Sequence, residues 1–194
     1  MIGIAMAELF TFFMAFVENP LQVGSLIPSS RHLLRRVVDA AGVRTASTIV
    51  ELGPGNGCST RAILQSAPEQ ARLLSIEVNS GLYELVRNID DKRVIAHQGN
   101  AGQLLEIISR YSLGPPDAVI SGIPFSTMKA TAANALLKDI STVLAPGGRF
   151  VAYQLSKRVA TLARPFLGIE HMEVELLNIP PMRVYRWVKN SDSG

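Results

Sequence analysis

The feature that most constrains the fold is a glycine-rich stretch, VELGPGNGCST, in which an apolar run leads into a helix-like segment. Gly53, Gly55 and Gly57 stand at alternate positions before a helix that we expect to begin near Ser59. Such glycines let the backbone turn sharply and approach a ligand where a side chain would collide. In the dinucleotide fingerprint G-x-G-x-x-G the third glycine follows the second by three residues, whereas here it follows by two. The stretch therefore predicts a ligand-binding turn that differs from the dinucleotide type.

An acidic residue, Glu51, stands two residues before the first of these glycines. We expect its carboxylate to point into the ligand pocket. A diphosphate would be repelled by that charge, and a cationic ligand would be attracted. The turn thus favours a positively charged ligand.

Short apolar runs alternate with helix-like stretches along the rest of the chain. The strands expected from these runs are Thr48–Leu52, Arg72–Glu77, Val94–Gln98, Ala118–Ser121 and Arg149–Leu155. The expected intervening helices are Ser59–Ala67, Gly81–Ile89, Ala101–Tyr111 and Ala130–Leu144. Continuous apolar strands between helices predict a parallel sheet covered on both faces. The final stretch, EHMEVELLNIPPMRVYRWVK, predicts two more strands joined at a Pro-Pro turn, and hence an antiparallel hairpin at one edge.

Length and composition bound the class of protein. The chain has 194 residues, of which 47% are hydrophobic and 18% charged, as expected for one globular domain with a sizeable core. Its net charge of +3 is too small to require a nucleic-acid partner. Cys58, the single cysteine, excludes an internal disulfide and a thiolate metal cluster, and we expect it to pack near its helix. We infer a reducing, cytoplasmic setting and expect no metal.

The first 28 residues form a separate segment, followed by a domain over residues 29–194. From Met1 to Val17 the only charge is Glu8, and the apolar residues follow helical spacing. The run is too short to span a bilayer, which takes about 20 apolar residues. Three interpretations remain open: an amphipathic helix that lies on a membrane as a peripheral contact, a helix that packs on the domain, and a cryptic secretory signal.

The glycine spacing, its acidic lead and a second strand that ends at Glu77 resemble the class I S-adenosylmethionine-dependent methyltransferases. The resemblance implies an α/β, Rossmann-like fold: a seven-stranded, mostly parallel sheet with helices on both faces, a C-terminal antiparallel hairpin and N-terminal helices. It also implies that Glu77 binds the ribose, that Glu51 helps to hold the amino group of the methionine moiety, and that Asn100 lies beside the adenine. The cofactor-binding residues expected on this basis are Glu51, Gly53, Gly55, Gly57, Glu77, Val78, Asn100, Ala101 and Ser121.

A fourth strand end, VISGIPFS, has no ionisable side chain. A sulfonium methyl donor needs none, because the acceptor has only to be held close to the methyl carbon. We expect Gly122, Ile123, Pro124 and Phe125 to bind the acceptor, with Phe125 closing over it; a loop that only packs is the alternative. Ribosomal RNA adenine methyltransferases carry N-L-P-Y or N-P-P-Y here, and Gly122 stands where their Asn grips the base. No nucleic-acid substrate is therefore expected.

Over nearly its whole length the chain resembles bacterial phospholipid N-methyltransferases. The matching pieces are NPLQVGSLIPSSRHLLRRV, ELGPGNGCST, SGIPFS, LAPGGRFVAYQ and NIPPMRVYRW. The resemblance implies methylation of phosphatidylethanolamine or a related amino-lipid, with the N-terminal helix on the inner face of the membrane. Two alternatives remain: an rRNA adenine N6-methyltransferase, and a non-catalytic binder of S-adenosylmethionine or lipid.

Further candidates lie near the start of the domain and at later strand ends. Ser29 or Ser30 is the expected N-cap of a helix, and both are expected to bind substrate. Arg31, with Arg35 on the same face, is expected to meet a lipid phosphate, the alternative being a solvated helix face. The catalytic candidates are Tyr153 and Tyr185, which would orient the amine, and His32, which would take its proton; packing or surface roles are the alternatives for all three.

Overall fold

The computed structural model describes residues 29–190 and forms one sheet whose central strand is β1 (Thr48–Leu52). Ile49, Val50 and Leu52 are fully buried because helices cover both faces of this strand. The other strands are β2 (Arg72–Glu77), β3 (Val94–Gln98), β4 (Ala118–Ser121), β5 (Arg149–Gln154), β6 (His171–Glu175) and β7 (Met182–Val188). The predictions made for residues 1–28 lie outside the described residues.

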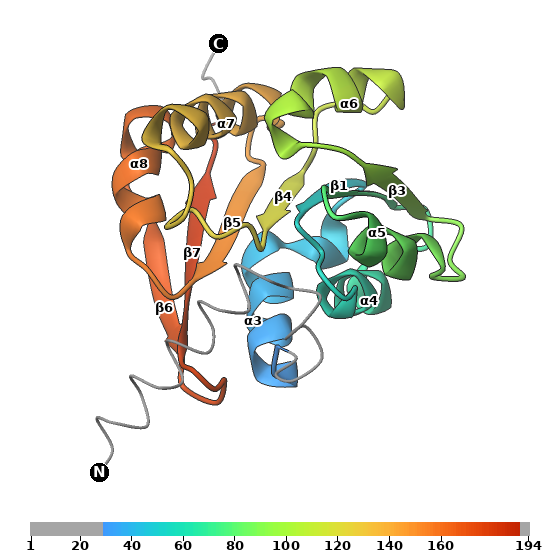
Figure 1. The fold of residues 1–194 in the computed structure, drawn as a ribbon, viewed down its shortest axis with the longest axis horizontal. Helices are drawn as coiled ribbons and strands as arrows, with labels where there is room; N and C mark the ends of the chain where they lie inside the picture. Colours follow the sequence, from blue (N-terminus) through green and yellow to red (C-terminus); the bar gives the residue numbers. More distant parts are fainter. Residues whose placement is uncertain (1–28, 191–194) are drawn as a thin grey trace.

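Two layers of helices enclose the sheet (Figure 1). One layer holds α3 (Arg31–Ala41), α4 (Cys58–Ser66) and α5 (Ser80–Arg87), and the other holds α6 (Leu104–Arg110), α7 (Ala130–Val143) and α8 (Arg158–Leu167). Short 3-10 turns span Val43–Thr45 and Ala101–Gln103. The predicted α/β fold with helices on both faces is confirmed.

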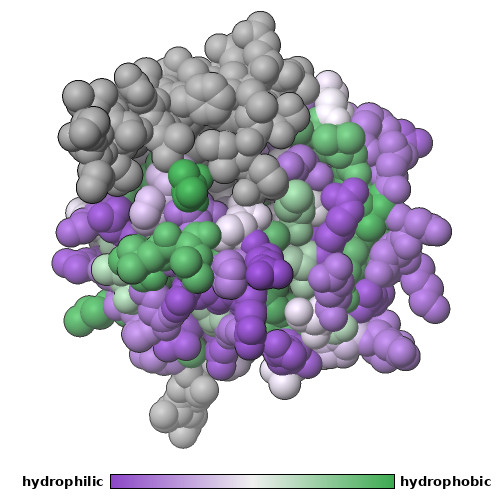
Figure 2. Space-filling model, turned by 90° about the horizontal axis from the view of Figure 1, so that it is seen from below, coloured by the Kyte–Doolittle hydropathy of each residue, from purple (hydrophilic) through white to green (hydrophobic). Residues whose placement is uncertain are grey.

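The strand order, β3-β2-β1-β4-β5-β7-β6, fixes where a ligand can bind. Strands β1 to β5 are parallel, and the order reverses direction between β1 and β4. Open parallel sheets bind ligands outside the carboxyl ends of their strands at such a reversal. The arrowheads of β4 and β5 in Figure 1 point to this edge, and Figure 2 views the molecule from the same side.

The C-terminal hairpin is also confirmed, because β7 pairs antiparallel with both β5 and β6. Its register brings Gln154, at the carboxyl end of β5, opposite Arg183, near the start of β7. The turn that joins β6 to β7 therefore projects from the same edge as the carboxyl ends of the parallel strands.

Local sequence explains where α3 begins and ends. The Ser30 hydroxyl accepts a hydrogen bond from the Leu33 amide at 3.1 Å, so Ser30, one of the two expected caps, is the N-cap. Gly42, at a φ of 67°, closes the helix in the left-handed conformation. Between them Leu33, Val37 and Val38 form a buried stripe against the sheet.

Candidate active site

The glycine loop turns directly out of β1 into α4. Gly53, Gly55 and Gly57 all have positive φ, at 70°, 58° and 80°, a conformation that L-residues with a Cβ rarely adopt. A Cβ added at Gly55 would meet no atom within 4 Å, so open space lies over this residue. The open backbone is therefore limited to Gly55, since a Cβ at Gly53 would lie 3.0 Å from the Ile123 side chain and one at Gly57 would lie 3.0 Å from the Arg61 side chain.

Glu51 lies beneath this loop instead of pointing into the pocket, which corrects the expectation drawn from its position. Its side chain is buried, and its carboxylate accepts hydrogen bonds from the hydroxyls of Ser59, Thr60 and Ser75, the latter two at 2.7 Å. Burial raises the pKa of the Glu51 carboxyl, and the three hydroxyls oppose that rise. Glu51 thus ties β1, α4 and β2 together under the glycines. Contact with a ligand amino group remains a proposal.

Glu77 closes the side of the loop from the end of β2. One carboxylate oxygen accepts the Gly55 amide at 3.2 Å, and the other accepts the Asn79 amide at 3.0 Å. Each oxygen keeps a lone pair for a further donor. The next residue, Val78, has a relative exposure of 69%, which is unusual for an aliphatic side chain at a strand end. A carboxylate acceptor and an exposed apolar side chain thus stand side by side next to the glycines.

Asn100 follows β3 and caps the 3-10 turn that begins at Ala101. Its Oδ1 accepts the Gly102 amide at 2.8 Å, while the residue as a whole is exposed. The remaining lone pair on Oδ1 can still accept a hydrogen bond from an amino group. This is consistent with the position expected for Asn100 beside an adenine.

The loop after β4 packs against the glycine loop. The Gly122 amide donates to the Leu52 carbonyl at 2.9 Å, and the amide of Ile123 donates to the Ser121 hydroxyl at 3.3 Å. A Cβ added at Gly122 would lie 2.5 Å from the Tyr153 hydroxyl and 2.7 Å from the Gly53 carbonyl oxygen. The position therefore requires glycine because Tyr153 and the glycine loop occupy the space.

Phe125 does not close over an acceptor, which corrects a second expectation. Its side chain is fully buried in the core between the sheet and α7 and α8, because the loop turns inward after Pro124. Gln154 fixes the backbone of this loop: its Nε2 donates to the Ile123 carbonyl at 2.7 Å, and its Oε1 accepts the Phe125 amide at 3.2 Å. Gln154 was missed in the sequence, where the only signal was a glutamine at the end of an apolar strand.

The two tyrosine candidates have different surroundings. The Tyr153 hydroxyl lies where a Gly122 Cβ would be, between the two loops. Burial, reinforced by the nearby Glu51 charge, raises the Tyr153 pKa to about 12, so this phenol stays protonated at neutral pH. Tyr185 is buried in the core, where its ring stacks on Trp187 and its hydroxyl has no partner among the described residues. The structure favours packing as the role of Tyr185.

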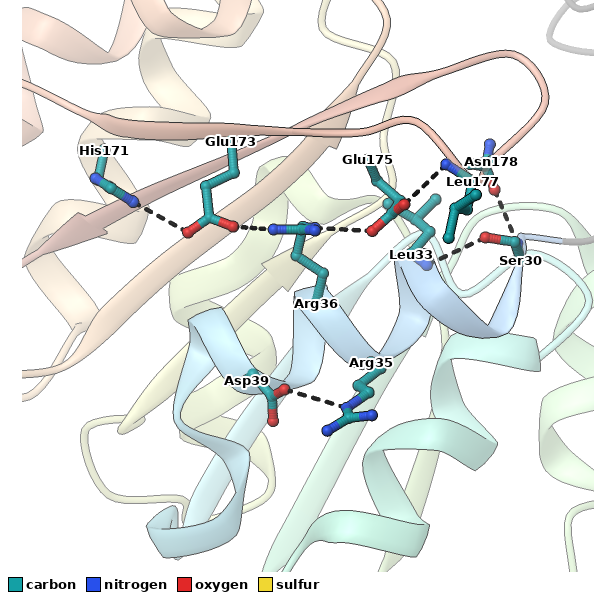
Figure 3. Close-up of polar contacts among 10 residues, drawn as sticks. All are labelled: Ser30, Leu33, Arg35, Arg36, Asp39, His171, Glu173, Glu175, Leu177 and Asn178. Carbon is teal, nitrogen blue, oxygen red and sulfur yellow. Dashed lines mark hydrogen bonds and ion pairs between the residues drawn. The ribbon is translucent and has the colours of Figure 1, made fainter.

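Ser29, Ser30, Arg31 and His32 lie at the start of α3, beside the β6–β7 hairpin. Arg31 and His32 are exposed, and His32 lines a cavity of about 400 Å³ between α3 and the hairpin. Arg36 bridges the two elements through Glu173 and Glu175, and Arg35 pairs with Asp39 at 3.8 Å (Figure 3). His32 therefore faces the hairpin cavity, and its catalytic use remains a proposal. His171 and His97 have structural partners, Glu173 and Tyr111.

The residues at this edge fit S-adenosylmethionine. Open space over Gly55 admits the methionine moiety, the free lone pairs of Glu77 suit ribose hydroxyls, and Val78 offers an apolar surface to the adenine. The Glu51 carboxyl lies buried under the loop, where its three hydroxyl partners hold it. The geometry thus suits a nucleoside ligand.

Sequence comparison gives relatives of one reaction class. An ornithine lipid N-methyltransferase from Singulisphaera acidiphila is 27% identical over 191 residues, covering 96% of this chain and all of the relative. Ribosomal RNA small subunit methyltransferase A from Ehrlichia canis is 33% identical over 97 residues, covering 50% of this chain and 36% of the relative. No protein-family model matches the chain.

Solved structures share the fold at low sequence identity. The O-methyltransferase TomG from Streptomyces achromogenes, solved with S-adenosylmethionine, has a TM-score of 0.68 at 18% identity and covers 94% of this chain and 89% of its own. The chain is an S-adenosylmethionine-dependent methyltransferase. The predictions of fold, enzyme class and cofactor are thereby confirmed, and so is the resemblance to lipid N-methyltransferases.

No helix within residues 29–190 is long and apolar enough to cross a bilayer.

Proposed function

We propose that this methyltransferase acts on the primary amine of a membrane lipid such as phosphatidylethanolamine. The observation that carries the proposal is Gly122. A Cβ there would collide with Tyr153 and with the Gly53 backbone, so the structure has no place for the asparagine that grips a base in rRNA adenine methyltransferases. The extent of similarity supports the same choice. The lipid enzyme matches along the whole chain, whereas the rRNA enzyme matches half of it.

Similarity to the ornithine lipid N-methyltransferase supports a second methyl acceptor, an ornithine lipid. Both lipids present an amine at the end of a polar headgroup, so one site can serve either. The proposed acceptor site is the loop from Gly122 to Pro124, and Ser29, Ser30 and Arg31 at the start of α3 are proposed to meet the rest of the headgroup.

The residues of the chain are proposed to act mainly by positioning the acceptor amine, and less by acid–base chemistry. When bound, S-adenosylmethionine would supply an activated methyl group: an amine lone pair would bond to the methyl carbon as the carbon–sulfur bond breaks, and the neutral thioether S-adenosylhomocysteine would leave. The Tyr153 phenol, held protonated by its raised pKa, can donate a hydrogen bond but cannot take a proton from the substrate ammonium. That proton has to leave to water or to another group. Gln154 fixes the loop backbone that would hold the amine within reach.

Gln154→Leu is expected to lower kcat about tenfold and to leave the affinity for S-adenosylmethionine unchanged. The reason is that a misplaced acceptor loop would orient the amine poorly toward the methyl group without disturbing the cofactor site. The measurement is steady-state methyl transfer beside a cofactor titration. Gln98→Leu is the matched control, since Gln98 also ends a strand but is exposed. An unchanged kcat, or an equal loss of cofactor affinity, would remove Gln154 from this positioning role.

Expression of the chain in a host that lacks lipid N-methylation tests the function itself. Mass spectrometry of the total lipid should show N-methylated forms of the host's amino-lipid, identified by headgroup fragmentation. The same host carrying Glu77→Ala should show much less of the product. If wild-type chain is present in soluble, cofactor-binding form and no methylated lipid accumulates in a host that contains both lipids, the proposed acceptor class is wrong.

A further inference from the structure

The turn between β6 and β7 displays aliphatic side chains to solvent. Leu176, Leu177 and Ile179 have relative exposures of 73%, 65% and 65%, and we call these three residues the aliphatic turn. The stretch from Leu176 to Met182 contains no charged residue. Exposed leucines occur singly on most soluble proteins, but a contiguous uncharged group of this kind marks an interaction surface.

The backbone of the aliphatic turn is tied to α3, so its exposure is built into the fold. Glu175 accepts the Leu177 amide at 2.8 Å and the Arg36 Nε at 2.9 Å, and these bonds hold its pKa below the usual range. The Asn178 side chain accepts the Ser30 amide at 2.8 Å (Figure 3) and donates to the Pro180 carbonyl at 2.8 Å. The buried polar groups of Glu175 and Asn178 thus satisfy the turn and leave its aliphatic side chains outside.

The aliphatic turn projects from the edge of the sheet that holds the active site. Gln154, which clamps the acceptor loop, pairs with Arg183 at the start of β7. In Figure 1 the turn extends beyond the carboxyl ends of β4 and β5, on the side of the molecule that Figure 2 displays. A surface that contacts the aliphatic turn therefore also faces the acceptor loop.

Exposed charges of both signs lie near the turn, and most of the acidic ones are paired. Arg31 and Arg35 lie exposed along α3, which begins beside the turn, and Arg35 is paired with Asp39. The carboxylates of Glu173 and Glu175 on the hairpin are paired with Arg36. An uncharged aliphatic projection with basic neighbours complements a bilayer that contains anionic lipid. Protein hot spots use mainly Trp, Tyr and Arg, with Leu under-represented, so a protein partner fits less well.

We infer that the aliphatic turn inserts into the lipid bilayer and brings the acceptor loop to the headgroup layer. The inference deepens the proposed function and rests on it, since a lipid amine held in a bilayer has to reach an active site that lies above the membrane. Burial of the three aliphatic side chains in the hydrocarbon of the bilayer is favourable by itself and requires no specific binding partner. The basic side chains of α3 would then lie at the depth of the lipid phosphates.

Vesicle flotation with the full chain tests the inference. The probe is a vesicle of phosphatidylcholine with a minor fraction of phosphatidylglycerol. Changing Leu176, Leu177 and Ile179 together to Ser is expected to weaken binding about tenfold or more, because partial burial of three large aliphatic side chains is lost. Ile169→Ser is the control, since Ile169 is 88% exposed and precedes β6 at the opposite edge of the sheet. That variant should float as the wild type does.

A single reporter variant measures insertion directly. Leu177→Trp should show quenching of its fluorescence by vesicles with brominated acyl chains, whereas the native Trp187 is buried in the core. Lack of quenching in a variant that floats normally would place the turn outside the bilayer and overturn the inference.

Two further readouts separate this inference from the proposed function. With a short-chain amino-lipid dispersed in detergent, the triple serine variant should methylate at the wild-type rate. If no lipid is methylated but vesicle binding still depends on the turn, the function is wrong and the docking surface stands. If the variant floats fully and instead changes its oligomeric state or melts early, a second copy or residues 1–28 cover the turn and the inference fails.

Discussion

Gly122→Asn is expected to destabilise the protein by about 2 to 3 kcal/mol and to abolish methyl transfer, because the new side chain overpacks a closed site. Its Cβ would lie 2.5 Å from the Tyr153 hydroxyl and 2.7 Å from the Gly53 carbonyl oxygen. Gly53 cannot retreat easily, since its amide is bonded to the Ile76 carbonyl and its own Cβ position is blocked by Ile123. Urea unfolding and a cofactor titration measure the two effects.

Two further variants make the Gly122 result specific. Gly114→Asn is the matched control, because a Cβ at Gly114 meets nothing within 4 Å and an exposed substitution is expected to stay within about 0.5 kcal/mol. Addition of Tyr153→Phe to Gly122→Asn removes the hydroxyl contact but leaves the Gly53 contact, so only part of the stability should return. A Gly122→Asn variant that folds as stably as the wild type would show that this loop can open, and the structural argument against a base-gripping asparagine would fall.

Glu77→Ala is expected to weaken S-adenosylmethionine binding by roughly 2 kcal/mol, as for the loss of hydrogen bonds to a charged group. That loss corresponds to about a thirtyfold higher Kd. Alanine removes the carboxylate that accepts the Gly55 and Asn79 amides. It also removes the free lone pairs that are proposed to accept hydrogen bonds from the ribose hydroxyls. Isothermal titration calorimetry with S-adenosylmethionine measures the change.

Glu84→Ala serves as the matched control for Glu77, because Glu84 is an exposed glutamate on α5 that pairs only with Arg87 among the described residues. It should bind the cofactor normally. Glu77→Gln separates charge from shape, since its amide oxygen can still accept one backbone donor. Wild-type affinity in a folded Glu77→Ala variant would refute the placement of the ribose at the end of β2.

The strands were predictable because each is a short, mostly apolar run; β1, β2, β4 and β5 are largely buried, whereas β3, at the edge of the sheet, is partly exposed. Four of the five expected parallel strands have the predicted bounds, and β5 ends one residue early, at Gln154. The helix α8 was missed because Pro165 and two basic residues, Arg158 and Arg164, obscure its pattern. Its buried residues Val159, Ala160 and Ala163 cover the sheet, and tertiary packing of this kind overrides weak local signals.

The site was predictable where backbone conformation alone decides it. The three glycines of the first loop have the positive φ angles that their spacing indicated. Side-chain directions were not predictable, because they depend on partners distant in the sequence. Glu51 turns under the loop to meet hydroxyls from α4 and β2, and Phe125 enters the core because Gln154, 29 residues away, holds its amide.

Methyl transfer from labelled S-adenosylmethionine in a single mixture of acceptors tests the central claim most directly. The purified chain is given vesicles that contain phosphatidylethanolamine and ornithine lipid together with protein-free immature ribosomal RNA, and the label is followed in the lipid and RNA fractions. The account predicts label on a lipid amine and none above background in RNA. Label in RNA with none in lipid would contradict the account and restore the adenine as the acceptor.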